Sequence, residues 1–369
     1  MKKAMLDQMI LTTCCPTDAG SKMLEGYQSL FNATVVEKLV NAGYEIVGKT
    51  PVGEFAIDLV GETNHKGARF DAEPLKNDTV QALITLDVNG APRRVAAQSG
   101  LVLAKPTYGI VSRFGTIPVA CSGECVSVMA KTVTDCRSTL ATLAGKDEKD
   151  GTMHADEVCQ GAVALAKKIK KVAVLKLPAD ADVTAKIESA KADMAANGIE
   201  ITEIDAGVIA TAKSAWSMLM CAELCNNVSR YDGVKYGYRT KNYKTLDELY
   251  TNSRTEAFGL LLKTAILYGS DVLSTKNYMA KYDKALRVRR VIVDAFAALF
   301  ADFDAVLLPA CSKMSYTEGD GAFAESLYTA PASITGLPAV VASGVQLMGP
   351  AFSDGSLLAL AALLTKEGN

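Results

Sequence analysis

The order of apolar and polar positions predicts alternating helices and strands. Apolar residues recur at helical spacing over 33–42, where Val35 and Leu39 share one face, and Gly43 suits the C-terminal end of that helix. The segment 44–47 follows directly and predicts a strand. Because a helix leads at once into a strand, we expect an α/β fold with a mostly parallel sheet.

The same criteria predict further elements along the rest of the chain. Short apolar runs favour strands, whereas longer runs with helical spacing favour helices. The predicted strands cover 81–88, 171–177, 199–204, 304–308 and 339–343. The predicted helices cover 133–144, 183–197, 210–229, 255–267, 277–300 and 356–364.

The sequence contains no repeat, linker or low-complexity segment, so we expect a single compact domain over 1–369. A chain of 369 residues can bury a large core. The charged, glycine-bounded segment 145–151 predicts a surface loop. If the domain divides at all, this loop separates the halves 1–150 and 151–369.

Composition narrows the class of protein. Hydrophobic residues make up 49% of the chain and charged residues 22%, which is typical of a globular protein. The net charge of −2 disfavours direct binding of nucleic acid. Asp7 interrupts the start of the chain where a signal peptide needs an apolar segment, and runs such as 357–364 are too short to cross a bilayer. We therefore predict a cytoplasmic protein without a membrane partner.

Several short stretches, taken in order, carry a family resemblance. They include Ala-Gly-Ser-Lys-Met-Leu at 19–24, Glu-Phe-Ala at 54–56, Lys-Pro-Thr-Tyr-Gly at 105–109, Ser-Arg-Tyr-Asp-Gly at 229–233, Tyr-Gly-Tyr-Arg at 236–239, Arg-Thr-Glu-Ala-Phe-Gly at 254–259 and Tyr-Thr-Ala-Pro at 328–331. Together they resemble amidase-signature enzymes, most specifically the A subunit of the glutamyl-tRNA(Gln)/aspartyl-tRNA(Asn) amidotransferase. The resemblance implies a mixed central β-sheet wrapped by helices. It also implies hydrolysis of glutamine to ammonia beside B and C subunits.

The resemblance implies a lysine base that acts through a bridging serine on a nucleophilic serine, a variant of triad chemistry. Two counts disagree on the lysine position. Counting back from Ser21 gives Asp7, and counting back from Thr12 gives Lys2. Both alternatives stay open at this point.

The nucleophile position is occupied by a residue without an oxygen. Counting back from Lys105 against the family's Ser-Asp-Thr-Gly-Gly-Ser motif gives Ala91 as the nucleophile position. In the same register Asp87 matches the aspartate, while Asn89 and Gly90 lie where backbone N–H groups form the oxyanion hole. The segment 64–82 has only one glycine and no serine, so the bridging serine is also expected to be missing.

The residues that hold the substrate are partly kept. By resemblance, Tyr238 and Arg289 match the tyrosine and arginine that grip the α-groups of glutamine. Arg289 also suits a plain helix surface, and that alternative stays open. Ser326 stands where the family has an acidic partner.

Other side chains are candidates for a relocated nucleophile or a metal site. Cys14, Cys15, Cys125 and Ser99 are the candidate nucleophiles, but no histidine lies near them in sequence, and neither His65 nor His154 has an identifiable carboxylate partner. The pairs Cys121/Cys125 and Cys221/Cys225 lack the CxxC spacing of metal sites. We expect packing roles for these residues, and no metal or cofactor.

These patterns favour a degenerate amidase that binds or scaffolds rather than catalyses. Its expected partners are B- and C-type amidotransferase subunits or an active paralogue. One alternative is a working glutamine amidase subunit with a relocated nucleophile. Another is a sensor that uses Tyr238 and Arg289 to bind glutamine or another small amide without turnover.

Overall fold

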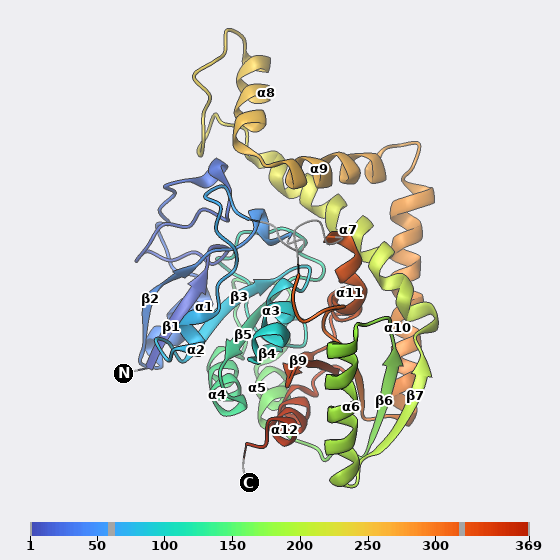
Figure 1. Cartoon of the computed structure of the whole chain (residues 1–369). Helices are drawn as coiled ribbons and strands as arrows, with labels where there is room; N and C mark the ends of the chain where they lie inside the picture. The colour runs from blue at the N-terminus through green and yellow to red at the C-terminus, as the bar shows by residue number, and fades with distance from the viewer. Residues whose placement is uncertain (1, 58–62, 317–321, 368–369) are drawn as a thin grey trace.

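The computed structural model describes residues 2–57, 63–316 and 322–367. Within them, ten strands form a sheet in the order β2-β1-β3-β5-β4-β9-β10-β8-β6-β7 (Figure 1). The strands are β1 Lys2–Asp7, β2 Tyr44–Thr50, β3 Ala82–Asp87, β4 Val102–Lys105, β5 Cys125–Ala130, β6 Lys171–Lys176, β7 Glu200–Asp205, β8 Ala305–Pro309, β9 Ala339–Ala342 and β10 Val345–Met348. This sheet confirms the predicted α/β class.

The sheet is mixed, as the family resemblance implied. Strands pair in parallel only in the two outer groups, β2-β1-β3 and β8-β6-β7. The contacts between β3 and β8, through β5, β4, β9 and β10, are all antiparallel. The mostly parallel sheet expected from the helix–strand pattern is therefore wrong. The first helix–strand step does give a parallel pair, but the central strands reverse direction.

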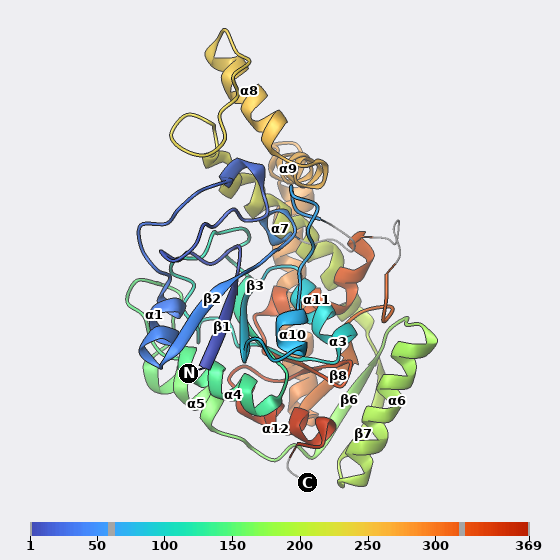
Figure 2. The same cartoon turned by 60° about the vertical axis from the view of Figure 1, so that its left-hand side comes forward.

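Helices surround the sheet. They are α1 Thr34–Asn41, α2 Glu73–Lys76, α3 Ala91–Ser99, α4 Val133–Leu143, α5 Asp156–Ala164, α6 Ala181–Ala196, α7 Ala212–Asn227, α8 Leu246–Ala257, α9 Leu260–Leu273, α10 Lys284–Asp302, α11 Ser326–Thr335 and α12 Asp354–Thr365. Helices α1, α4, α5 and α12 contact one another along the sheet, and α7, α9, α10 and α11 form a second group. Helix α8 projects from the body in both views (Figures 1 and 2).

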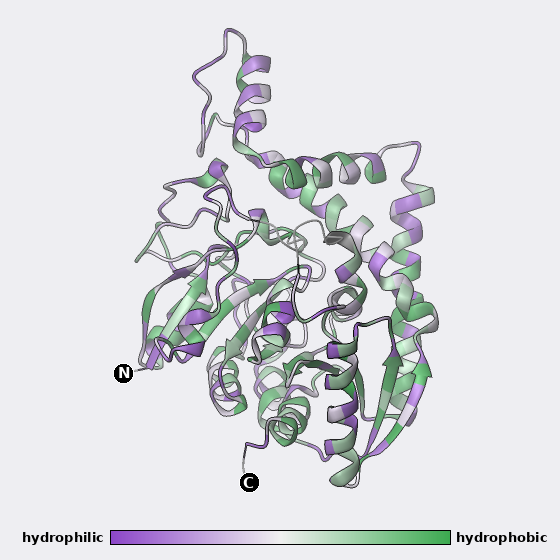
Figure 3. Ribbon diagram, in the orientation of Figure 1, coloured by the Kyte–Doolittle hydropathy of each residue, from purple (hydrophilic) through white to green (hydrophobic). Residues whose placement is uncertain are grey.

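The hydropathy of the strands matches their burial in the sheet. Every residue of the central strands β3, β4, β5, β8, β9 and β10 is buried. Strands buried on both faces need continuous apolar runs, and Figure 3 shows these strands mainly in the colour of hydrophobic residues, whereas α8 and the loop before it are more polar. The continuous run in β3 is why its strand could be predicted from sequence.

The helix predicted over 255–267 is wrong, because the chain breaks there into α8 and α9. Phe258 leaves helical geometry with ψ 136°, and Gly259 precedes α9 with ψ 167°. The backbone N–H of Gly259 instead donates to Glu54 Oε2 at 2.8 Å. A contact distant in sequence therefore overrides a continuous helical pattern.

The segment Gly207–Arg230, which contains α7, is long and apolar enough to cross a membrane by length and composition alone. Half of it is buried inside the protein. Trp216 and Leu224 are fully buried, and α7 packs against α9, α10 and α11. The apolar composition of α7 is thus accounted for by its place in the core.

Candidate functional site

The turn between β3 and α3 carries the residues aligned with the amidase nucleophile. Gly90 adopts a left-handed conformation with φ 83°, and Ala91 is the first residue of α3. A Cβ atom on Gly90 would lie 2.2 Å from the Cβ of Thr329. Helix α11, which carries Thr329, therefore packs directly onto this turn, and only glycine fits there.

Asp87, at the end of β3, is held by a buried arginine that the sequence patterns did not reveal. Arg93 Nε lies 2.7 Å from Asp87 Oδ2, and Arg93 Nη2 donates to Asp87 Oδ1 at 3.1 Å. Both side chains are fully buried. The guanidinium also donates to Thr329 O at 2.8 Å, Gln346 Oε1 at 3.0 Å and Ser333 Oγ at 2.9 Å. Asp87 thus serves to fix β3, α3 and α11 together.

Asn89 and Ala91 are both sealed in the interior, with 3% and 5% exposure. The backbone carbonyl of Asn89 accepts hydrogen bonds from Arg94 Nη1 and Thr329 Oγ1, each at 2.9 Å. The Asn89 side chain donates to Ile57 O at 3.2 Å. Ala91 contributes only a methyl group to this turn.

Lys2 and Asp7 lie at opposite ends of β1. Lys2 is exposed at the start of the strand, with Nζ 5.4 Å from the ring centre of Tyr44. Asp7 is fully buried at the end of β1 and accepts hydrogen bonds from Met9 N, Thr85 Oγ1 and Leu86 N at 2.7–2.8 Å. Burial raises the pKa of Asp7. Of the two, only Asp7 adjoins the end of β3 that leads into the β3–α3 turn.

Tyr238 and Arg289, aligned with the substrate-gripping residues, lie in different surroundings. Tyr238 OH donates to Glu256 Oε2 at 2.5 Å, which raises the pKa of the phenol. Arg289, on α10, donates to Ser122 O at 3.1 Å. Among the described residues, no hydrogen bond or ion pair joins Tyr238 to Arg289.

Ser326 begins α11 and is almost fully buried, with 1% exposure. The residue before it, Glu325, is acidic and buried. Glu325 accepts a hydrogen bond from Ser312 N at 2.9 Å and further bonds from the hydroxyls of Ser312 and Tyr316.

Two of the candidate nucleophiles, Cys15 and Cys125, have poorly ionising thiols. Burial raises the pKa of Cys15 to about 11, and the Sγ atoms of Cys14 and Cys15 lie 3.4 Å apart. Burial also raises the pKa of Cys125. Because the thiolate is the reactive form, neither Cys15 nor Cys125 is prepared for attack. Ser99 ends α3, away from the β3–α3 turn at its start.

No group of three or more His, Cys, Asp or Glu side chains is arranged to hold a metal ion within the described ranges 2–57, 63–316 and 322–367. Both Cys121 and Cys125 have raised thiol pKa values, mainly through burial. Burial likewise raises the pKa of Cys221 to about 12.

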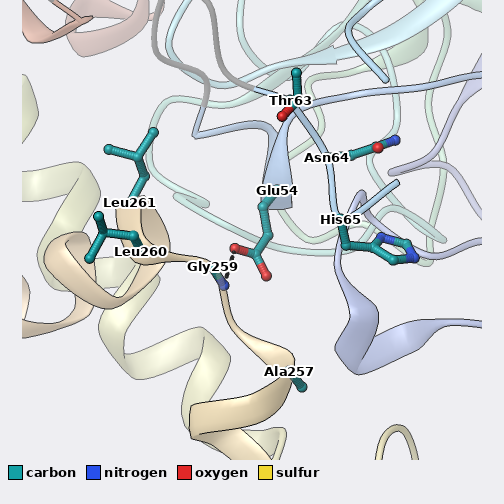
Figure 4. A pocket seen from close by; sticks show the side chains of 8 residues that line it. All are labelled: Glu54, Thr63, Asn64, His65, Ala257, Gly259, Leu260 and Leu261. Carbon is teal, nitrogen blue, oxygen red and sulfur yellow. Dashed lines mark hydrogen bonds between the residues drawn. The ribbon is translucent and has the colours of Figure 1, made fainter. Parts of the chain in front are cut away.

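A cavity that the sequence did not predict lies where the 3-10 helix Glu54–Ala56 meets the junction of α8 and α9. It has a volume of about 320 Å³. Its lining comprises Glu54, Thr63, Asn64, His65, Ala257, Gly259, Leu260 and Leu261 (Figure 4). No carboxylate partner of His65 could be identified from the sequence, but its Nε2 lies 3.7 Å from Glu25 Oε1.

Comparisons with known proteins identify the family. The model of the amidase family matches residues 7–70 and 79–358. The A subunit of the glutamyl-tRNA(Gln) amidotransferase of Agathobacter rectalis is 32% identical over 97% of this chain and 78% of its own length. The corresponding protein of Lachnoclostridium phytofermentans is 34% identical over 88% of this chain and 71% of its own.

Solved structures give the same result. The crystal structure of the A subunit of the glutamyl-tRNA(Gln) amidotransferase from Thermotoga maritima matches with a TM-score of 0.78 and 25% identity, covering 99% of this chain and 83% of that one. The peptide amidase of Stenotrophomonas maltophilia shares the fold, with a TM-score of 0.77 and 21% identity over 99% of this chain and 82% of its own. With the sheet, the sealed β3–α3 turn and these matches together, the chain belongs to the amidase family.

Proposed function

We propose that this chain is a non-catalytic member of the amidase family that acts by binding or scaffolding. Its proposed partners are B- and C-type amidotransferase subunits or an active paralogue in the cytoplasm. The similarity to proteins named as amidotransferase A subunits supports a role beside other subunits. The observation that carries the proposal is Ala91, a residue without an oxygen at the nucleophile position.

The surroundings of Ala91 support loss of catalysis rather than local distortion. The left-handed Gly90, the start of α3 and the buried pair between Asp87 and Arg93 are all in place. These contacts hold a methyl group at the position that the resemblance assigns to the nucleophile of acyl transfer. Removing a catalytic nucleophile of this kind costs an enzyme on the order of 10⁴–10⁶ in rate.

The two candidate positions for the catalytic base also lack the surroundings that this role requires. A lysine must be neutral to deprotonate a serine, and this requires burial near that serine. Lys2 is exposed at the far end of β1, whereas Asp7 already accepts three hydrogen bonds. Neither residue is suited to take a proton from a side chain at the β3–α3 turn.

The two alternatives have less support. Attack by a relocated thiol is disfavoured by the raised pKa values of Cys15 and Cys125. A sensor that grips an amino acid between Tyr238 and Arg289 is disfavoured because each side chain is held by other groups, Glu256 and Ser122.

The test is a glutaminase assay of the purified chain, alone and with a B/C-type subunit pair. The Agathobacter rectalis protein serves as the active control, and Ala91→Ser as the matched variant. We expect no ammonia above background from the wild type. We expect the same from Ala91→Ser, because the base and the bridging serine are still missing. Ammonia release by the wild type at an enzyme-like rate would overturn the proposal.

Binding is tested separately by size-exclusion chromatography of the chain mixed with B/C-type subunits, then with an active paralogue. Co-elution with either supports the scaffold role. Failure to co-elute with both contradicts the proposed partners and leaves the catalytic result unchanged, so the two parts of the proposal can fail independently.

A further inference from the structure

The cavity beside Glu54 is separate from the β3–α3 turn. None of its lining residues is aligned with the nucleophile, the base or the substrate-gripping side chains. Its volume of about 320 Å³ falls at the small end of the range for ligand pockets. One wall comes from Glu54 and the segment 63–65, and the other from Ala257 and the start of α9 (Figure 4).

Glu54 places a buried carboxylate in this cavity. The residue is 6% exposed, and its oxygens accept hydrogen bonds from Ser21 Oγ at 2.6 Å and Gly259 N at 2.8 Å. A Cβ atom on Gly259 would lie 2.7 Å from Glu54 Oε2, so glycine permits this close approach. A carboxylate has about four acceptor sites, and two of them are filled. Among the described residues, no cationic side chain forms an ion pair with Glu54.

His65 adds a second unsatisfied group. Both ring nitrogens are buried, and neither has a hydrogen-bond partner within the described residues. The nearest carboxylate, Glu25, is 3.7 Å from Nε2, which is beyond hydrogen-bond distance. The imidazole is close enough to Glu54 to lower the pKa of that carboxyl electrostatically, against the larger effect of burial. Buried polar groups without partners are rare in native proteins and mark places where a ligand or water binds.

The remaining wall is apolar. Ala257, Leu260 and Leu261 line the side formed by the α8–α9 junction, and Leu260 is 79% exposed at its rim. A ligand suited to this cavity therefore needs a cationic donor at one end and a short aliphatic part at the other.

We propose that this cavity binds a small primary amine in its ammonium form. The nitrogen lies against the Glu54 carboxylate, and the aliphatic chain lies along Leu260 and Leu261. An ammonium group supplies three donors, two of which match the free acceptor sites of Glu54. This inference does not depend on the proposed non-catalytic function, because it uses none of the positions aligned with the nucleophile, the base or the substrate-gripping residues.

The test is isothermal titration calorimetry with n-butylamine at neutral pH, where it is an ammonium ion, and with uncharged n-butyramide as the matched probe. We expect saturable binding of n-butylamine at least about tenfold tighter than that of n-butyramide, since a hydrogen bond to a charged group discriminates by about this factor. Glu54→Gln should weaken n-butylamine binding by about tenfold or more. Glu157→Gln, an exposed carboxylate on α5, should leave it unchanged.

Leu260→Lys provides a variant that does not depend on the buried carboxylate. Leu260 is at the surface, so this change should leave the melting temperature unaltered while its cationic head weakens n-butylamine binding severalfold. The proposal is overturned if n-butylamine gives no saturable binding, if n-butyramide binds equally well, or if correctly folded Glu54→Gln and Leu260→Lys both bind n-butylamine like the wild type.

Discussion

The β3–α3 turn and the cavity at Glu54 differ in whether a buried carboxylate has a cationic partner. At the turn, Asp87 is neutralised by Arg93, whose donors also reach a carbonyl, an amide and a hydroxyl. In the cavity, Glu54 has only neutral donors, and His65 beside it has no hydrogen-bond partner among the described residues. A fully paired buried network fixes structure, whereas an incompletely paired one is available to a ligand. Among the described residues, the buried charge at the β3–α3 turn is therefore the more completely paired of the two.

The largest effect is expected when the buried pair at the turn is broken. Arg93→Met leaves Asp87 as an uncompensated buried charge, which should lower the free energy of unfolding by about 3–5 kcal/mol. Equilibrium urea unfolding measures this loss. The double variant Asp87→Leu/Arg93→Met should recover much of it, because the unpaired charge is then gone. A loss below about 1 kcal/mol in Arg93→Met would mean that the pair is not structural.

Gly90→Ala tests how tightly α11 packs onto the turn. Alanine is strained at φ 83°, and its Cβ would overlap Thr329 at 2.2 Å. We expect a loss of about 2–4 kcal/mol from backbone strain and overpacking together. Thermal unfolding followed by circular dichroism measures it. Gly100→Ala is the matched control, because Gly100 also has a positive φ, 66°, but has open space around it. This variant should therefore lose stability through backbone strain alone.

Gly259→Ala makes the corresponding change at the cavity, where the expected loss is smaller, about 1 kcal/mol. The backbone of Gly259 is favourable for alanine, but the new Cβ would lie 2.7 Å from Glu54 Oε2 and displace the carboxylate. Gly161→Ala, inside α5 with its nearest neighbour 3.8 Å away, should instead stabilise by about 0.5–1 kcal/mol. If thermal unfolding shows the same change in stability for Gly259→Ala and Gly161→Ala, a tight contact between residue 259 and Glu54 is excluded.

The smallest effect concerns pH. Burial raises the pKa of Glu54 above its usual 4.5, so the folded protein holds the proton more tightly than the unfolded chain does. The resulting stabilisation is complete below pH 4.5 and is lost as pH rises through the folded-state pKa. Wild type should therefore lose stability relative to Glu54→Gln between about pH 4 and pH 7. Urea unfolding of both proteins across this range measures the difference in their free energies of unfolding. A difference that does not change with pH would contradict the raised pKa of Glu54.

Local patterns predicted those parts of the fold that depend on neighbours in sequence. The helix at 33–42 and the strands at 171–177 and 339–343 have clear periodicity or apolar runs, and the structure confirms them within a few residues. The strand β1, with Lys2 and Lys3 at its start, was missed because it is stabilised by pairing on both sides rather than by an apolar run. The break before α9 depends on Glu54, far away in sequence.

For the candidate site, the sequence could locate only residues that are close together in the chain. Asp87, Asn89, Gly90 and Ala91 lie within one short segment, so one anchor located the whole turn. The partners of Asp87 could not be foreseen, because Arg93 connects it to residues from α11 and β10 that only the folded sheet brings close. The cavity at Glu54 likewise combines segments about two hundred residues apart, and neither segment indicates by itself that the two meet.

The pairing of β4 with β9 also constrains how the protein can be made. Leu103 lies beside Val341, so β4 has no neighbour on that edge until almost the whole chain has been synthesised. At ribosomal speeds of about 5–20 residues per second, this edge stays open for roughly 10–50 s. An open, apolar strand edge is a template for pairing with other chains. Nascent copies of this protein should therefore depend on chaperones until their last strands emerge.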